Sequence, residues 1–268
     1  MKRDRQTVTL RHAEMLALIR DRQEILVDEL ASAFDISPMT VRRDLQSLEE
    51  QGKISRFHGG ATVDLRSVSA EEKDQVAQCR RLIARCAASL VSSGESLLIN
   101  GSNTALGLLE HLDSKSVSVF TNNALVVGRK YPAGIDVQLS GGVLRGAQHI
   151  LTGDLTMRNL INIHADRAFL GCTGISRDGE ILCGIPSELG INETMIEHSN
   201  AYYILADYTK IGKAGTYASF HLEKKGCVIT DELAPEDVLT RLRAIGMQVL
   251  QVGHSEFPDV WQTSDNEE

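Results

Sequence analysis

The stretch from Ser37 to Gly52 constrains the fold of this chain more than any other. Ser37 is a favourable N-cap residue, and Pro38 falls at the first helical position, where its missing N–H costs nothing. The apolar positions that follow have helical spacing and form one stripe: Val41, Leu45 and Leu48. Gly52 is placed to end the helix. The stretch therefore predicts a short amphipathic helix with a buried back.

The face of this helix away from the stripe is suited to hydrogen bonding. It carries Met39, Thr40, Arg43, Gln46 and Ser47, with Arg42 at the flank. An apolar back and a hydrogen-bonding front fit a helix that reads the major groove of DNA. They also fit an ordinary amphipathic helix with a solvated charged face. The stretch alone does not decide between the two.

The neighbouring segments favour the DNA-reading interpretation. Periodicity predicts two helices before it, at Leu10–Arg20 and Ile25–Phe34, and the turn Asp35–Ser37 separates the second of these from the reading helix. After it, Lys53–Phe57 and Ala61–Val63 flank a glycine pair and predict a β-hairpin wing. Three helices and a wing predict a winged helix-turn-helix DNA-binding domain over residues 1–63.

Individual roles within this domain follow from side-chain chemistry. Arg43 and Gln46 are the candidates for base edges, because arginine suits guanine and glutamine suits adenine. Four residues are predicted to contact phosphates, which position a protein without reading sequence: Thr40, Arg42, Lys53 and Arg56. For Arg42, pairing with an acidic neighbour that braces the fold is an equal alternative. The predicted DNA-facing set also includes Ser37, Met39 and His58.

Composition bounds the remaining possibilities. The net charge of the 268 residues is −8, but basic and acidic residues balance up to Gly60, so a local basic patch is compatible with it. No apolar run could span a bilayer, and the N-terminus lacks the apolar core of a signal peptide. The five cysteines form no C-x-x-C pair. We therefore expect a cytoplasmic protein with buried reduced thiols and neither a disulfide framework nor a metal site.

The rest of the chain predicts a second, α/β domain. A polar linker at residues 64–70 precedes a long helix at Glu71–Val91. The predicted strands are Ser96–Ile99, Val117–Phe120, Asp136–Leu139, Arg167–Leu170, Ala201–Ala206, Cys227–Ile229 and Gln248–Val252. The predicted helices are Thr104–Leu112, Ala124–Lys130, Ser187–Ser199 and Pro235–Ile245. Such alternation predicts a Rossmann-like, mostly parallel sheet covered on both faces over residues 71–253. An acidic tail at residues 254–268 carries Trp261, which could dock on the body.

Polar residues cluster where the predicted strands end. Ligands of open α/β sheets bind at the carboxyl ends of strands, and small residues opening a helix cradle anions. Lys210 could meet a phosphate, and Asp207 could accept from a hydroxyl or hold Lys210. The candidate ligand-binding residues are Asn100, Gly101, Ser102, Asn103, Thr104, Thr121, Asn122, Gly141, Gly142, Asp166, Gly171, Glu188, Asp207 and Lys210. Each turn alone could be plain turn chemistry, but together they predict a small anionic ligand.

The residues around the reading helix also resemble a known family. The run from Glu29 to Ala61 contains R-R-D-L, L-E-x-x-G and H-G-G-A, and it resembles the N-terminal signature of the DeoR family of bacterial transcriptional regulators. The resemblance implies a second domain that is similar to ribose-5-phosphate isomerase and binds phosphorylated sugars or related metabolites. It also implies a homodimer or homotetramer.

The resemblance extends over the second domain, from Arg11 to about Val252 in all. The matching positions are Thr121-Asn122, Gly141-Gly142, Gly153, Asp166, Gly171, Glu188, Met195, Asp207, Lys210 and Thr230-Asp231. Four positions depart from the family pattern. In the loop that usually reads D-x-G-[ST]-T, Asn100 replaces the aspartate and Ser102 the glycine. Asn192 and Arg80 stand where the family usually has lysine.

The leading hypothesis is a DNA-binding repressor of sugar or carbohydrate metabolism genes, controlled by an anionic metabolite and needing no cofactor, metal or catalytic residue. Ligand binding would favour one arrangement of paired DNA domains over another. The alternative is a sugar-phosphate isomerase with a DNA-binding extension, for which Asp166, Glu188 and Asp207 are carboxylate candidates. Against it, no Lys-Gly-rich stretch lies between Asp166 and Gly184. A DNA architectural protein with an inert α/β body is a third possibility.

Overall fold

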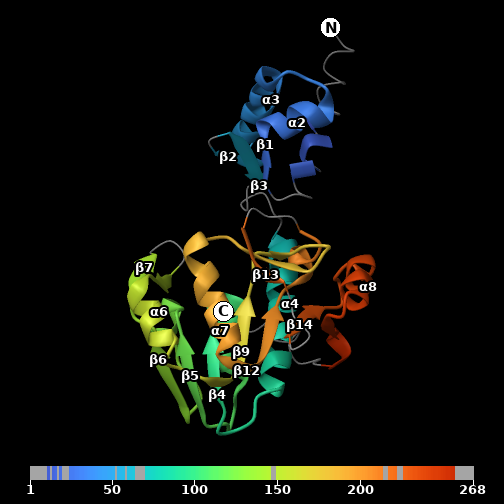
Figure 1. The fold of residues 1–268 in the computed structure, drawn as a ribbon. Coiled ribbons are helices and arrows are strands. Elements are labelled where there is room, and N and C mark those ends of the chain that lie inside the picture. Colours follow the sequence, from blue (N-terminus) through green and yellow to red (C-terminus); the bar gives the residue numbers. More distant parts are fainter. Residues whose placement is uncertain are drawn as a thin grey trace, which may run out of the picture. The chain divides into compact units, whose positions relative to one another are not determined.

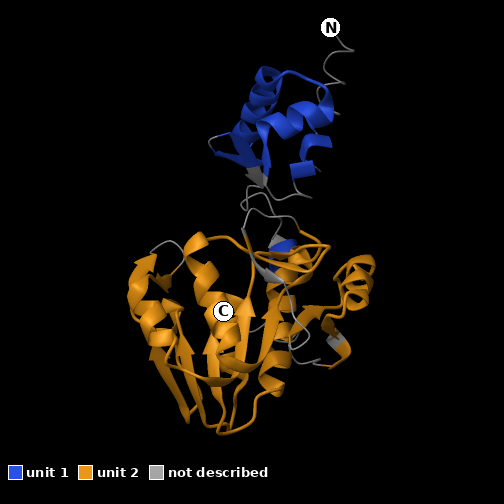
Figure 2. Ribbon diagram, in the orientation of Figure 1, with its two compact units in different colours: residues 1–74 blue, residues 75–268 orange. Residues whose placement is uncertain are grey.

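The computed structural model describes residues 11–12, 14–16, 18–19, 24–51, 53–57, 59–63, 70–145, 149–213, 217–221 and 226–256. The chain divides into two compact units, Met1–Asp74 and Gln75–Glu268 (Figure 2). The predicted domain limits at residues 63, 70 and 253 remain predictions. Gly52, His58, residues 64–69 and Trp261 lie outside the described residues, while Ala70 begins a helix.

The first unit is built from helices around a small apolar core (Figure 1). Residues 11–12, 14–16 and 18–19 are helical, α2 spans Val27–Phe34 and α3 spans Pro38–Glu50. The predicted stripe of α3 is confirmed, because Val41, Leu45 and Leu48 are buried together with the following residues: Met15, Ile19, Leu30 and Ile54. This burial explains why α3 is held firmly on one side while its other side stays exposed.

A three-stranded antiparallel sheet completes the unit. The predicted hairpin is confirmed as β2 (Ile54–Phe57) and β3 (Gly60–Val63). A further strand, β1 (Glu24–Leu26), pairs with β3, so the prediction that the second helix begins at Ile25 is wrong. Ile25 is buried opposite Ala61 in this sheet, and β-branched residues favour that pleated setting. The helix begins only at Val27, where the helical spacing of apolar residues starts.

The second unit is organised by a seven-stranded sheet in the order β15-β14-β12-β9-β4-β5-β6. Its strands are β4 (Ser96–Ile99), β5 (Val117–Thr121), β6 (Ile135–Leu139), β9 (Ala165–Gly171), β12 (Ser199–Leu205), β14 (Gly226–Asp231) and β15 (Gln248–Val252). Every neighbouring pair is parallel, which confirms the predicted α/β fold class. The strand order reverses between β4 and β9, and open sheets of this type bind ligands at such a reversal.

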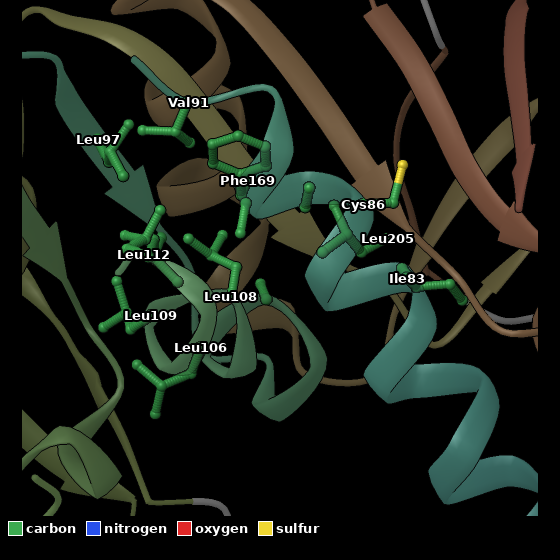
Figure 3. Close-up of a cluster of buried hydrophobic side chains, with 14 of the residues drawn as sticks. Ile83, Cys86, Val91, Leu97, Leu106, Leu108, Leu109, Leu112, Phe169 and Leu205 are labelled. Carbon is green, nitrogen blue, oxygen red and sulfur yellow. The ribbon is translucent and has the colours of Figure 1, made fainter. Parts of the chain in front are cut away.

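Successive residues of each strand enter two different cores, one on each face of the sheet. On β9, for example, Phe169 joins one core while Ala168 and Leu170 join the other. The first core lies under α4 (Ala70–Ser89), α5 (Asn103–Leu106) and the 3-10 helix η2 (Gly107–His111) (Figure 3). The second lies under α6 (Asp154–Leu160), α7 (Leu189–Glu197) and α8 (Glu236–Ala244). Helices therefore cover both faces, as predicted (Figure 1).

One predicted helix of this unit is wrong. Residues 124–130 form only the short 3-10 turn η3 (Ala124–Val126). Asn123 caps the turn by accepting from Leu125 N at 3.0 Å, and the turn ends at Val127 in an extended conformation. Gly128 then has a φ of 92°, which a continuing helix cannot contain.

Several short elements were absent from the prediction. They are the antiparallel hairpin β7 (Val143–Arg145) and β8 (Ile150–Thr152), the helix α6, and a small antiparallel sheet of β10 (Gly174–Ile175), β11 (Glu180–Cys183) and β13 (Tyr217–His221). The 3-10 turns η4 (Pro186–Glu188), η5 (Tyr208–Lys210) and η6 (His254–Glu256) complete the described structure. No helix in the described part of the chain is both long and apolar enough to cross a membrane.

Candidate functional site

The candidate DNA-reading face is the exposed side of α3. Ser37 caps the helix by accepting from the Thr40 N–H at 3.2 Å, and the two hydroxyl groups lie 2.9 Å apart. The Thr40 hydroxyl is therefore already engaged within the cap. Met39 and Arg43 lie one turn apart and are both exposed. The structure thus brings them together on the surface that the sequence assigned to DNA.

Two other predicted DNA contacts are partly engaged within the first unit. The Gln46 side-chain amide donates to Glu50 Oε1 at 3.1 Å. Arg56 on β2 bonds to Glu49 on α3 twice, from its backbone N–H at 3.0 Å and from Nε at 3.3 Å. Arg56 Nη1 also reaches the Arg42 carbonyl at 3.5 Å. The wing is therefore braced against α3 by Arg56, whereas the Arg42 side chain is exposed and makes no ion pair within the described residues.

A buried carboxylate on α3 connects this helix to the helical residues near the start of the chain. Asp44 accepts a two-pronged contact from Arg11, with Nε at 2.8 Å and Nη2 at 3.1 Å, and His12 Nε2 lies 3.1 Å from it. Burial raises the pKa of Asp44, but the hydrogen bonds and charges of Arg11 and His12 outweigh it and lower the pKa below its ordinary value. Asp44 therefore stays ionised and ties the first helix to α3. None of these three residues has a role predicted from the sequence.

The second candidate site is a cavity of about 430 Å³ at the carboxyl ends of β4 and β9, where the strand order reverses. Its floor is the loop 100–104 that follows β4. Asn100 is buried and fastens this loop to β9, because its amide contacts both the N–H and the carbonyl of Gly171 at 3.0 Å. Isoleucine and leucine side chains form much of the remaining wall: Ile150, Leu170, Ile181, Leu182, Ile185 and Ile204.

Two cations reach this cavity, Arg80 from α4 and Lys210 from η5. Arg80 Nε donates to Asp207 Oδ2 at 2.8 Å, and Asp207 is completely buried. Burial raises the pKa of Asp207, but the charges of Lys210 and Arg80 outweigh it and lower the pKa below its ordinary value. An ionised Asp207 therefore bonds to the Arg80 guanidinium and attracts the Lys210 ammonium at the edge of one cavity. Such a pair suits a carboxylate or phosphate ligand.

Glu188 adds a buried carboxyl group to the same cavity. It is 8% exposed, and its closest hydrogen-bond partner is the Cys183 thiol at 3.8 Å. Burial raises the pKa of Glu188 because it disfavours the charged form of the carboxyl group. Its Oε1 lies so near Gly101 that a β-carbon there would sit 2.8 Å away. Glycine is therefore required at position 101 to let the acid and the loop approach each other.

Comparison with known proteins identifies both units. Residues 11–66 match the family model of the DeoR-like helix-turn-helix domain, and residues 75–232 match that of the DeoR C-terminal sensor domain. The chain belongs to the DeoR family. Its DeoR helix-turn-helix domain contains α3, and its DeoR sensor domain contains the cavity.

Named relatives of this DeoR chain are transcriptional repressors. The HTH-type transcriptional repressor GlcR of Bacillus subtilis (strain 168) is 29% identical over 91% of this chain and 96% of the relative. The glycerol-3-phosphate regulon repressor of Escherichia coli (strain K12) is 30% identical over 86% of this chain and 94% of the relative. Among solved structures, ribose 5-phosphate isomerase A from Methanocaldococcus jannaschii is 15% identical, with a TM-score of 0.37 over 50% of this chain and 54% of that chain.

The DeoR sensor domain gathers most of the candidate ligand residues into the cavity wall. Those that line it are Asn100, Gly101, Ser102, Asn103, Thr104, Gly171, Glu188 and Lys210. Others lie behind the wall. Thr121 and Asn122 are fully buried, and the Asn122 amide donates to Leu151 O at 3.1 Å. Asp207 acts on the cavity through Arg80 and Lys210 without lining it.

Three candidate residues do not belong with this group. Gly141 and Gly142 follow the edge strand β6 and pack against α6, where the Gly141 carbonyl accepts from the Thr156 hydroxyl at 2.7 Å. Asp166 lies at the amino end of β9 and accepts from the Ser96 N–H and hydroxyl, each at 2.8 Å. Asp166, a predicted ligand-binding residue, therefore lies away from the cavity, which is at the opposite ends of β4 and β9.

Two departures from the DeoR pattern contact each other. The Asn100 amide donates to Asn192 Oδ1 at 3.0 Å, and Asn192 lines the cavity. At two positions where the family pattern has an aspartate and a lysine, this chain has two amides, which contact each other without either charge. At the third departure, Ser102 has a φ of −74°, which needs no glycine, and it caps α5 by accepting from Ala105 N at 3.3 Å.

Sequence reasoning missed several residues of the cavity. Arg80 was noted only as a departure from a family lysine, yet it is one of the two cations. Cys172 and Cys183 also line the cavity, and burial raises the pKa of each thiol to about 11. Ile150 belongs to β8, a strand that was not predicted. Within the described residues, no cluster of three histidine, cysteine or acidic side chains is placed to hold a metal ion.

Proposed function

We propose that this DeoR-family regulator is a cytoplasmic repressor of sugar or carbohydrate metabolism genes and that its cavity binds a phosphorylated sugar or a related anionic metabolite. The observation that carries the proposal is the pair of cations, Arg80 and Lys210, that line the cavity at a sheet reversal beside buried Asp207, which bonds to Arg80. The repressor role is supported by the names of the relatives, which are repressors of sugar-related and glycerol-3-phosphate genes.

The mechanism is a linkage between two equilibria. A ligand that favours one arrangement of paired DNA domains changes operator affinity by its difference in affinity for the two arrangements. A homodimer or homotetramer would read two half-sites roughly 34 Å, or a multiple of it, apart. Within each copy, the proposed DNA-reading groups are Arg43 for base edges and Arg42 and Lys53 for phosphates.

As part of this proposal, the protein binds its ligand without converting it. An isomerase needs a base that is ionised in the resting site to remove a proton from carbon. Among the residues that the structure describes, the carboxyl group that lines the cavity belongs to Glu188, and burial raises its pKa. Asp166 lies at the other end of the sheet. These positions favour binding over turnover.

Thermal shift with a panel of pentose, hexose and glycerol phosphates tests the proposal, with the unphosphorylated compounds as controls. We expect a phosphorylated compound to raise the melting temperature of the full-length protein and to change its affinity for operator DNA. Lys210→Ala should abolish the shift and leave DNA binding of the ligand-free protein intact. Lys130→Ala, an exposed lysine away from the cavity, is the matched control and should keep the shift. A panel without any shift, or a shift that survives Lys210→Ala, would remove the proposed site.

A further inference from the structure

The exposed face of α3 has an apolar residue, Met39, at its amino-terminal end. Four residues follow one another at spacings of four, three and four, and thus form a single stripe along the helix: Met39, Arg43, Gln46 and Glu50. This stripe lies opposite the buried one of Val41, Leu45 and Leu48. Met39 begins the stripe at the second position of the helix and is 72% exposed, while the apolar residues behind it are at most 1% exposed.

Neighbouring side chains are committed to contacts within the first unit. The Thr40 hydroxyl is held by Ser37, and the Gln46 amide is held by Glu50. The Glu50 carboxylate at the far end of the stripe would be repelled by phosphates, which keeps that end of α3 away from the DNA backbone. The amino-terminal half of the helix is therefore the part that approaches bases, as is usual for the second helix of a helix-turn-helix. In that half, Met39 and Arg43 are the exposed members of the stripe.

A methionine in this place selects for one feature of DNA. Its thioether has no N–H or O–H to donate, so it cannot read the acceptors of guanine or adenine. The apolar feature that the major groove displays is the 5-methyl group of thymine. We propose that Met39 reads a thymine methyl in each operator half-site and so is a specificity-determining residue of this regulator.

The position of that thymine follows from helix geometry. Side chains one turn apart have their β-carbons about 5–6 Å apart, and stacked base pairs are spaced by about 3.4 Å. The thymine read by Met39 thus lies within about two base pairs of the guanine read by Arg43. This inference rests on the proposed DNA-binding function and adds the base that an apolar side chain selects.

A methyl-deletion scan tests the inference directly. DNA sites are first selected from a random duplex library with the full-length protein. Each thymine of the selected site is then replaced singly by uracil, which removes only the 5-methyl group. We expect one replacement per half-site to weaken binding roughly fourfold, the effect of losing one buried methyl contact. In Met39→Ala the same replacement should have no effect.

Two further variants keep the test sharp. Met39→Leu retains an apolar side chain and should keep sensitivity to uracil, whereas Arg43→Ala should lose preference for guanine and keep that sensitivity. Because Met39 is exposed, circular dichroism should show all three variants folded like the parent. Uniform tolerance of uracil, or sensitivity that persists in Met39→Ala, would overturn the reading by Met39. A library that yields no enriched sequence would instead overturn the proposed DNA-binding function itself.

Discussion

Asp44 and Asp207 are both buried carboxylates that pair with an arginine, but the two units use the pair differently. In the first unit Arg11 is 22% exposed, and its contact with Asp44 joins two helices of one core. In the second unit Arg80 is 45% exposed and lines a cavity while Asp207 holds it from behind. The same chemistry therefore fixes a helix in one case and presents a cation to a ligand in the other.

The largest effect should come from breaking the pair that fixes a helix. Asp44→Ala leaves the charge of Arg11 without its partner, which costs roughly 3 kcal/mol for a buried pair. We expect amide hydrogen exchange in α3 to accelerate about a hundredfold, while exchange in the strands of the second unit is unchanged. Arg11→Ala should give a similar acceleration, and the double variant little more, because the two residues form one contact. Unchanged exchange in α3 would remove Asp44 as its anchor.

A smaller effect should follow from removing the Asp207 carboxylate, which bonds to Arg80 and attracts Lys210. Asp207→Asn should lower the free energy of unfolding by about 2 kcal/mol at neutral pH, since hydrogen bonds to charged groups contribute about that much. The folded pKa of Asp207 is lowered, so this stabilisation is present above the unfolded pKa and is lost as the pH falls through the folded pKa. Asp136→Asn, at an exposed position on β6, is the control. If the difference in free energy of unfolding between the parent and Asp207→Asn grew toward acid pH, the lowered pKa of Asp207 would be contradicted.

Glu188 should show the opposite dependence on pH. Its folded pKa is raised above the ordinary value of 4.5, so its contribution to stability is complete below the unfolded pKa and is lost as the pH rises through the folded pKa. Each unit of difference between the two pKa values corresponds to about 1.4 kcal/mol. Chemical unfolding at several pH values should therefore show that the free energy of unfolding of Glu188→Gln rises relative to that of the parent as the pH rises. Parallel curves would place Glu188 in contact with a cation or water.

The smallest effect should come from the brace between the wing and α3. Arg56 and Glu49 are 37% and 43% exposed, and pairs of this kind contribute about 0.2–1 kcal/mol. Glu49→Gln should change the free energy of unfolding by no more than that and weaken operator binding only severalfold. A double-mutant cycle with Arg56→Ala measures the interaction energy of the Arg56–Glu49 pair. A large change in sequence preference would show that Glu49 or Arg56 contacts bases.

The spacing of apolar residues predicted the helices and strands whose formation depends on their own sequence. The stripe of α3 and the parallel sheet follow from apolar spacing along single elements. The hairpin β7–β8 and the small sheet around β11 were missed because their strands have only two to five residues. In addition, β11 pairs with β13, which lies far from it in the sequence. A helix over residues 124–130 was predicted from composition, but the cap at Asn123 and the positive φ of Gly128 prevent it.

The candidate site was partly predicted for a similar reason. Residues that follow a strand, such as Asn100 and Gly171, could be read from their place in the sequence. Arg80 could not, because it reaches the cavity from a helix and contacts Asp207, which lies 127 positions later in the chain. Asp44 was overlooked because its partner Arg11 lies 33 positions earlier. Pairings across such distances are decided by tertiary packing, which a single sequence does not display.

The helix α4 joins the cavity to residue 70 by one continuous stretch of helical backbone. It begins at Ala70, close to the division between the two units at Asp74, and carries Arg80 to the cavity ten residues later. An α-helix rises 1.5 Å per residue, so about 15 Å of unbroken rod separates Arg80 from the start of α4. Arg80 and residue 70 therefore belong to one continuous hydrogen-bonded element, and the apolar face of this element is fixed in the core by Leu82, Ile83 and Ala87.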